Sequence, residues 1–183
     1  MALEEFTPPA TFETARLRGR LPRVSDAPAI FEAYASHPAV TRYLAWRHYR
    51  EVAPLEDFLR QSVANWANGQ GHRPYLLTLR SDDRPIGSIG FARDGGKVMF
   101  GYVLGPAYWG KGYMSEALAF LTGWALAQPG IFRAWAFCDV ENPASARVME
   151  KAGMSREGLL RRWHVCPELG PELRDCLVYA KVR

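Results

Sequence analysis

The sequence predicts an α/β (α+β) fold in a single domain that covers residues 1–183. About seven apolar runs have the length and alternation of strands, and about four amphipathic stretches have the spacing of helices. Three of the strands follow one another across short turn sequences, which favours an antiparallel meander. A length of 183 residues with 48% hydrophobic residues is enough for one sizeable core.

The N-terminal part should begin with a poorly ordered segment, residues 1–12, which is acidic and contains prolines. Alternating apolar residues then predict a first strand over 14–20. Ser25 and Asp26 begin a helical stretch that extends to Tyr34, and a second helix is expected from about 52 to 66.

The central part should be the antiparallel meander. Its strands are expected over 75–80, 85–92 and 98–104. Residues 81–84 and 93–96 between them are rich in Asp, Gly and Ser, which are typical turn residues.

A glycine-rich loop connects the meander to the next helix. Residues 108–118 read Tyr-Trp-Gly-Lys-Gly-Tyr-Met-Ser-Glu-Ala-Leu. Gly110 and Gly112 let the backbone approach an anion without a Cβ, and the helix N-terminus adds unpaired N–H groups and a positive dipole end. With the charge of Lys111, this pattern predicts a phosphate cradle. The same pattern is also compatible with an ordinary strand-to-helix turn.

A second strand-to-helix unit follows. An apolar strand is expected over 132–138 and a helix over 143–152. Asn142 suits the N-cap of this helix and Gly153 suits the position after its end. Two terminal strands are expected near 155–165 and 174–182.

Both glycine-bearing segments resemble motifs of one family. The loop from Trp109 resembles the pyrophosphate loop of the GCN5-related N-acetyltransferases (GNAT), most closely the Trp-Gly-Lys-Gly-Tyr-x-Ser/Thr-Glu-Ala form of the RimJ/RimL-like branch. Residues 142–154 resemble the family signature Asn-x-x-Ser/Ala-x-x-x-x-x-Lys-x-Gly-Phe, with Met154 in the Phe place. The resemblance implies the GNAT acyl-CoA N-acyltransferase fold, a mixed, mostly antiparallel central sheet of about seven strands flanked by about four helices.

A P-loop NTPase is the alternative for the same loop. Residues 105–111 match the spacing of a Walker A motif, but Gly112 stands where that motif needs a Ser or Thr hydroxyl for Mg²⁺. The later strand ends in Asp139, as a Walker B strand does. The antiparallel meander argues against this alternative, because a Walker A strand normally lies in a parallel sheet.

The GNAT resemblance implies acetyl-CoA as cosubstrate and no metal. In the family, the strand 98–104 offers main-chain N–H groups to the thioester and pantetheine, here through Val103 and Leu104. Asn142 would contact the pantetheine arm, and the branch assigns the residue at Ser145 to the coenzyme sulfur. The implied pyrophosphate contacts are Trp109, Gly110, Lys111, Gly112, Tyr113, Met114 and Ser115.

Two side chains that the family often uses for acid–base chemistry are replaced. Met99 stands where many members carry Glu, and Met149 stands where many carry Tyr. This departure keeps open a non-catalytic alternative, an acetyl-CoA-binding sensor module.

Ser145 and His164 are the candidate catalytic residues. The branch resemblance places His164 where a Glu base has been proposed, and a histidine with a pKa near 6.5 accepts a proton at neutral pH. The structural alternatives are a first-turn helix serine and a solvated strand histidine. His72 and Glu157 are weaker candidates for the base.

The expected acceptor is a primary amine that attacks the thioester directly. At pH 7 an α-amine with a pKa near 7.7–8.0 is roughly 10% neutral, whereas a lysine is neutral at only about 0.04%. A site without the usual Glu therefore favours an α-amine, such as a protein N-terminus of the ribosomal-protein type, with a small amine as the other candidate. Tyr43, Trp46 and Trp66 are expected to line the acceptor cleft or to pack in the core.

Composition excludes several classes of protein. The net charge of +4 is modest and scattered, so nucleic acid is not an expected partner. The N-terminal residues lack a signal-peptide pattern, and no run reaches the roughly 18 apolar residues of a membrane span, so we expect a cytoplasmic monomer or homodimer. Cys138, Cys166 and Cys176 lack metal-ligand spacing and are expected to be reduced thiols, with Cys138 in the core.

Overall fold

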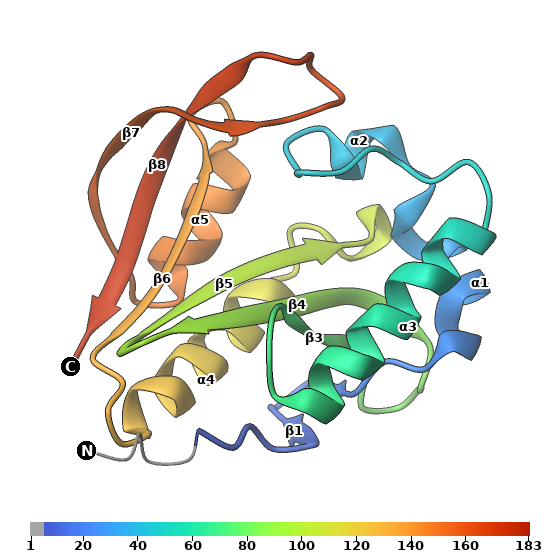
Figure 1. Cartoon of the computed structure of the whole chain (residues 1–183), viewed down its shortest axis with the longest axis horizontal. Helices are drawn as coiled ribbons and strands as arrows, with labels where there is room; N and C mark the ends of the chain where they lie inside the picture. The colour runs from blue at the N-terminus through green and yellow to red at the C-terminus, as the bar shows by residue number, and fades with distance from the viewer. Residues whose placement is uncertain (1–5) are drawn as a thin grey trace.

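The computed structural model describes residues 6–183 as one eight-stranded sheet with helices on both faces (Figure 1). The strand order is β1-β2-β3-β4-β5-β6-β8-β7, and all neighbours are antiparallel except the parallel pair β5 and β6. The predicted mixed, mostly antiparallel sheet is confirmed, with one strand more than expected. The strands are β1 (Thr11–Glu13), β2 (Leu17–Arg20), β3 (Arg73–Leu79), β4 (Pro85–Asp94), β5 (Lys97–Leu104), β6 (Arg133–Asp139), β7 (Ser155–Val165) and β8 (Leu173–Val182).

The helices divide between the two faces and create two hydrophobic cores. Neighbouring residues of a strand point to opposite faces, so Leu76 of β3 packs against α1 and α3, whereas Tyr75 and Leu77 belong to the core that contains α4 and α5. The helical elements are η1 (Val24–Asp26), α1 (Ala27–Ile30), η2 (Phe31–Ala35), α2 (Pro38–Thr41), α3 (Ala53–Asn68), η3 (Pro106–Tyr108), α4 (Tyr113–Ala127) and α5 (Pro143–Lys151).

The first predicted strand, over 14–20, contains only β2, and β1 is a further strand that precedes it. A turn at Thr14 separates β1 from β2, and it is closed by the Thr14 N–H, which donates to the Leu17 carbonyl at 2.9 Å. Thr11 and Phe12 belong to the segment for which little order is predicted, but they form part of β1. The Phe12 ring fixes this strand, because it packs between Tyr75 and Phe120. The part of that expectation that concerns residues 1–5 lies outside the described residues.

The first predicted helix is a series of short turns. A helix over 25–34 was expected, but η1, α1 and η2 follow one another there, and α2 continues after a break. The Ser36 N–H donates to the Phe31 carbonyl at 3.1 Å, five residues back, which widens the last turn into a π-helix. Pro38 then begins α2.

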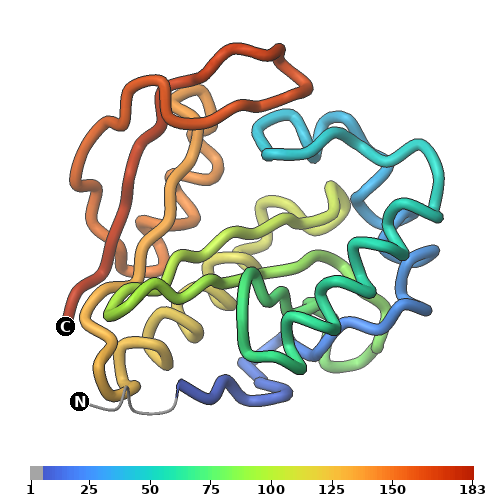
Figure 2. The backbone as a smooth tube through the Cα atoms, in the orientation of Figure 1, coloured from blue at the N-terminus to red at the C-terminus, as the bar shows by residue number. Residues whose placement is uncertain are grey.

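The sheet splits between β5 and β6. The two strands pair only at Lys97 with Arg133, Val98 with Ala134, and Met99 with Trp135. Beyond Met99, β5 stays paired with β4 and β6 stays paired with β8, so the two half-sheets diverge (Figure 1; Figure 2). This split is the feature around which the candidate site is arranged.

Two composition-based expectations can be compared with the structure. All three cysteines are buried free thiols, and burial raises the pKa of Cys138 to about 11. Within residues 6–183, no helix has the length and apolar character that a bilayer crossing requires.

Candidate active site

The predicted cradle joins the end of β5 to the start of α4. Gly110 and Gly112 both have positive φ, +74° and +78°, which glycine adopts without strain. A Cβ at Gly110 would meet no described atom within 4 Å, so the loop backbone is open to a ligand. Gly112 is the N-cap of α4, and no described side chain caps this end. The free first-turn N–H groups and open backbone fit an anion such as a pyrophosphate.

Arg16 holds the cradle from the turn between β1 and β2. Its Nη1 donates to the Lys111 carbonyl at 2.8 Å and its Nε donates to Glu116 at 2.6 Å. The other Glu116 oxygen accepts from the Thr14 hydroxyl at 2.6 Å. Although burial raises the pKa of Glu116, these hydrogen bonds hold it below its usual range. Sequence reasoning missed Arg16, although a Glu in the first turn of α4 was a signal that a cation could lie near.

The side chains of Lys111 and Trp109 fold back onto the loop. The Lys111 Nζ donates to the Ala107 carbonyl at 2.9 Å, so its charge lies beside the cradle. The Trp109 indole N–H donates to the Leu104 carbonyl at 2.7 Å. Both contacts fix the loop relative to the end of β5.

The first turn of α4 contains the remaining predicted coenzyme contacts. The Met114 side chain is buried in the core at 4% exposure, so only its main chain is available to a ligand. Tyr113 lies half-buried beneath the Arg16 guanidinium, whose central carbon is 4.6 Å from the ring centroid. Ser115 is half-buried in the same turn.

The split exposes the main chain of one edge of β5. The Gly105 N–H donates to the Ile86 carbonyl at 2.8 Å, which directs it toward β4. Because N–H directions alternate along a strand, the Val103 N–H also points toward β4 and the Leu104 N–H points into the split. Of the two predicted main-chain contacts, the geometry therefore favours Leu104.

Ser145 lies on the first turn of α5 and contacts β5 across the split. The Asn142 Oδ1 accepts the Ser145 N–H at 3.1 Å, which confirms Asn142 as the N-cap. The Tyr102 hydroxyl lies 2.8 Å from the Ser145 Oγ and 3.1 Å from its carbonyl oxygen. Burial raises the pKa of Tyr102, so its hydroxyl stays protonated. Sequence reasoning missed Tyr102. The available signal was its hydroxyl group at a strand position that faces the core, because a buried tyrosine hydroxyl usually has a hydrogen-bond partner.

His164 lies on the other face of the same half-sheet. Its ring centroid is 5.1 Å from that of Phe137 in an edge-to-face arrangement. The next β6 residue, Cys138, points to the core that contains α5, so Ser145 and His164 lie on opposite faces. Burial lowers the pKa of His164, and the negative charge of Asp139 opposes this shift.

The weaker base candidates have different surroundings. The Glu157 Oε1 accepts from the Arg133 Nη1 at 2.9 Å, and this ion pair lowers the pKa of Glu157 at the closed end of the split. The His72 ring lies over Gly90, where an added Cβ would be 2.1 Å from its Nε2. Loss of hydration lowers the pKa of His72.

The predicted acceptor-site aromatics lie mainly in the cores. Trp66 packs on Tyr75 with a centroid distance of 4.7 Å and donates its indole N–H to the Pro74 carbonyl at 2.8 Å. Trp46 packs on Tyr49 in the core beside α1 and α3. Trp66 therefore packs against one core, and Trp46 is partly buried at the edge of the other core. Tyr43 is half-buried, with the Arg42 guanidinium above its ring.

A row of aromatic rings near His164 was not predicted. The Phe137 ring packs on Trp135 of the same strand at 6.2 Å and on Trp163 of β7 at 6.3 Å, measured between centroids. Trp135 and Phe137 occupy alternate positions of β6, on the face opposite α5. Alternation of this strand was the signal that could have found them.

Glu168 connects the loop between β7 and β8 to the end of α2 and to the segment that follows it. Its Oε1 accepts from the Thr41 hydroxyl at 3.0 Å and from the His48 main-chain N–H at 2.8 Å, and it lies 2.7 Å from the His48 Nδ1. These contacts lower the pKa of Glu168. The two half-sheets are therefore linked again at the open side of the split, where Figure 1 shows the loop beside α2.

Asp139 is a structural carboxylate. It is fully buried, and it accepts from the Arg174 Nη2 at 3.1 Å and from the Glu141 N–H at 2.9 Å. No cluster of potential metal ligands occurs among residues 6–183. β5 pairs antiparallel with β4 along its whole length and parallel with β6 only over residues 97–99, so it does not lie in the parallel sheet that a P-loop NTPase requires, and this alternative is wrong.

Comparison with known proteins agrees with this architecture. Residues 16–155 match the acetyltransferase (GNAT) domain family. The chain is 32% identical over 169 residues to the uncharacterized N-acetyltransferase YnaD of Bacillus subtilis (strain 168), covering 91% of this chain and 94% of that protein.

Two solved structures share the fold. The microcin C7 self-immunity acetyltransferase MccE, in complex with acetyl-CoA and AMP, has a TM-score of 0.85 at 19% identity, covering 97% of this chain and 98% of that one. RimL, a ribosomal L7/L12 α-N-protein acetyltransferase in complex with coenzyme A, has a TM-score of 0.80 at 21% identity, covering 95% and 96%. The chain thus belongs to the GNAT family and is an acetyl-CoA-dependent N-acetyltransferase.

Proposed function

We propose that this acetyltransferase modifies an α-amine, with a protein N-terminus of the ribosomal-protein type as the first candidate and a small amine as the second. The observation that carries the proposal is the position of Met99. It is the last β5 residue paired with β6, at the point where the split begins. A thioether there cannot remove a proton, so the acceptor with the lower pKa is favoured.

The geometry of the loop and the split supports the proposed coenzyme contacts. In this proposal, the N–H groups of residues 110–115 bind the pyrophosphate at the start of α4, where no described side chain caps the helix. The Leu104 main chain and the Asn142 side chain contact the pantetheine arm along the split. Acetyl-CoA, when bound, supplies the acetyl group as a thioester.

We assign the acid–base roles to two residues on opposite faces of the half-sheet that contains β6. His164 accepts the amine proton as the new C–N bond forms, and its lowered pKa keeps it neutral at pH 7. The Ser145 hydroxyl donates a hydrogen bond to the sulfur as the C–S bond breaks, which stabilises the departing thiolate. The Tyr102 hydroxyl, which contacts the Ser145 Oγ, donates a hydrogen bond to the serine oxygen during this step.

A panel of acceptors tests the proposal, with release of free CoA as the readout. It contains N-terminal peptides of ribosomal proteins, the same peptides with blocked α-amines and a free lysine, polyamines and aminoglycosides. The RimL likeness selects the first peptides for testing. A higher kcat/KM for α-amine peptides than for their blocked counterparts supports the proposal. Preference for the lysine side chain contradicts it.

A further inference from the structure

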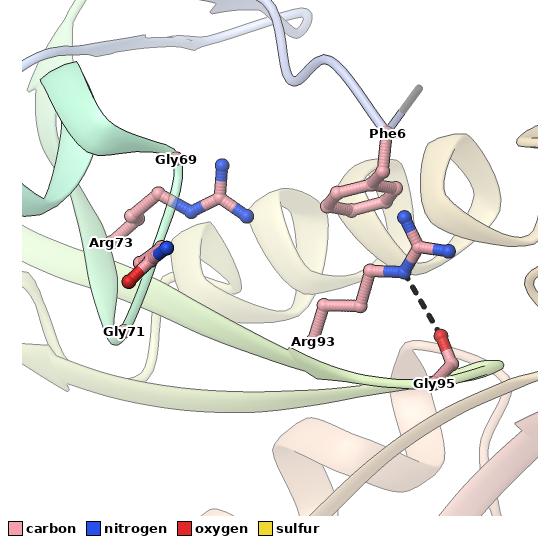
Figure 3. Close-up of a pocket in the computed structure, with 7 residues that line it drawn as sticks. Phe6, Gly69, Gly71, Arg73, Arg93 and Gly95 are labelled. Atoms are coloured by element: carbon pink, nitrogen blue, oxygen red, sulfur yellow. Dashed lines mark hydrogen bonds between the residues drawn. The ribbon is translucent and has the colours of Figure 1, made fainter. Parts of the chain in front are cut away.

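A second cationic site lies far from the cradle. A cavity of about 340 Å³ lies where β3 begins and β4 ends, between Arg73 and Arg93, with Phe6 at its border. Figure 3 shows both guanidinium groups and the Phe6 ring bordering the same space.

The charge of Arg73 is buried without a described counter-ion. Arg73 is only 5% exposed, and its Nε is buried with no hydrogen-bond partner within residues 6–183. Arg93 donates its Nε to the Gly95 carbonyl at 2.9 Å, and neither arginine has an ion pair in this part of the chain. Burial and, more weakly, the charge of Arg93 lower the pKa of Arg73. A buried cation without a partner is costly, so the site favours an anion.

The two guanidinium groups lie over aromatic rings. The Arg73 central carbon is 4.7 Å from the Phe91 centroid, and that of Arg93 is 5.2 Å from the Phe6 centroid. Cation–π contacts offset part of the burial cost but use no N–H donor. The terminal Nη groups of both arginines have no hydrogen-bond partner within residues 6–183 and remain available for the paired oxygens of a carboxylate or phosphate.

We propose that this cavity binds an oxyanion, the carboxylate or phosphate group of a small molecule, between Arg73 and Arg93. It is separate from the cradle, because Phe6 packs on Trp124 at the far end of α4, about 16 Å along the helix axis from Tyr113. Residues 4 and 5 of the sequence are glutamates that carry the same carboxylate chemistry, and they lie outside the described residues. The experiment therefore distinguishes a dissolved anion from the chain itself.

Inorganic phosphate is the probe, titrated at constant ionic strength into protein saturated with acetyl-CoA so that the cradle is already filled. The readouts are the melting temperature and the ¹H–¹⁵N resonances of the arginine Nε groups. The parent is compared with Arg93→Gln and with the double variant Glu4→Gln/Glu5→Gln. Arg60→Gln is the matched control, since Arg60 is exposed on α3 and pairs with Glu56 and Asp57.

Phosphate should shift the Arg73 and Arg93 resonances and raise the melting temperature in a saturable way. Arg93→Gln should weaken phosphate binding about tenfold or more, whereas Arg60→Gln should not. If only the Glu4→Gln/Glu5→Gln variant responds to phosphate, the oxyanion site is supported, and the oxyanion that occupies it in the parent is a carboxylate of the chain itself. Unchanged affinity in Arg93→Gln, or no response in both the parent and the double variant, overturns the proposal.

Discussion

The Tyr102 hydroxyl lies 2.8 Å from the Ser145 Oγ and joins β5 to α5 across the split in the sheet. Ser145→Ala should lower kcat more than it weakens acetyl-CoA binding, because a hydrogen bond to sulfur strengthens only as thiolate charge develops. Tyr102→Phe should lower kcat less, and the double variant should resemble Ser145→Ala, since both residues act on one atom. Steady-state kinetics and calorimetry measure these effects. Additive losses would show that Tyr102 acts independently of Ser145.

The cradle can be tested at Gly112. Asn and Asp both tolerate its left-handed conformation better than other side chains, but only Asp adds a negative charge. Gly112→Asp should weaken acetyl-CoA binding by roughly tenfold or more relative to Gly112→Asn, through repulsion of the pyrophosphate. Asp is also a good N-cap, so loss of α4 would not explain the result. Equal calorimetric affinities would place the pyrophosphate elsewhere.

His164 gives a prediction about pH. Its pKa is lowered below the usual 6.5, so the neutral form increases as pH rises through that lowered value. For an α-amine acceptor, the logarithm of kcat/KM should rise steeply at pH values below the pKa of His164, because both the histidine and the amine must lose a proton. Between the pKa of His164 and the pKa of the amine it should rise more gently, because only the amine must still lose one. His164→Gln should remove the lower break and reduce activity on the order of 10²-fold.

His37→Gln is the control for His164→Gln, because His37 is exposed and its Nε2 contacts the Glu32 carbonyl. It should keep the parent profile. If His164→Gln also keeps it, the same measurement on His72→Gln shows whether the ring over Gly90 is the base.

Arg174 should stabilise the fold through Asp139. Although burial alone would raise the pKa of Asp139, Arg174 holds it below its usual range, so the pair contributes stability above the unfolded-state pKa and loses it as pH falls. Arg174→Gln should cost about 3 kcal/mol at pH 7, because it leaves a buried carboxylate unpaired. Denaturant unfolding should show this loss shrinking toward acid pH, as Asp139 becomes neutral in the variant. A loss independent of pH would contradict the assignment.

Many helices and strands could be predicted because they depend on interactions between residues that are close in the sequence. Asn142 and Pro143 begin α5 as expected, and the glycines of the cradle have the predicted open backbone. The series of turns before α2 was missed because its π-turn depends on one hydrogen bond that spans five residues, from the Ser36 N–H to the Phe31 carbonyl.

The site was less predictable because its contacts are distant in sequence. The Arg16 to Glu116 pair spans 100 residues, and the Tyr102 to Ser145 contact spans 43. Neither leaves a pattern within one strand or helix. The sequence indicated which residues carry chemistry, and the topology of the sheet decides which of them meet.

The contact of Glu168 with Thr41 and His48 has a consequence for access. Together with the short β5–β6 pairing, it closes a frame around the split by joining the two half-sheets at both of its ends. A chain end or a small molecule can be threaded through a frame, whereas the middle of a folded polypeptide cannot. The size of the frame would then select acceptors by how far their amine projects from the bulk of the molecule, before any chemical recognition takes place.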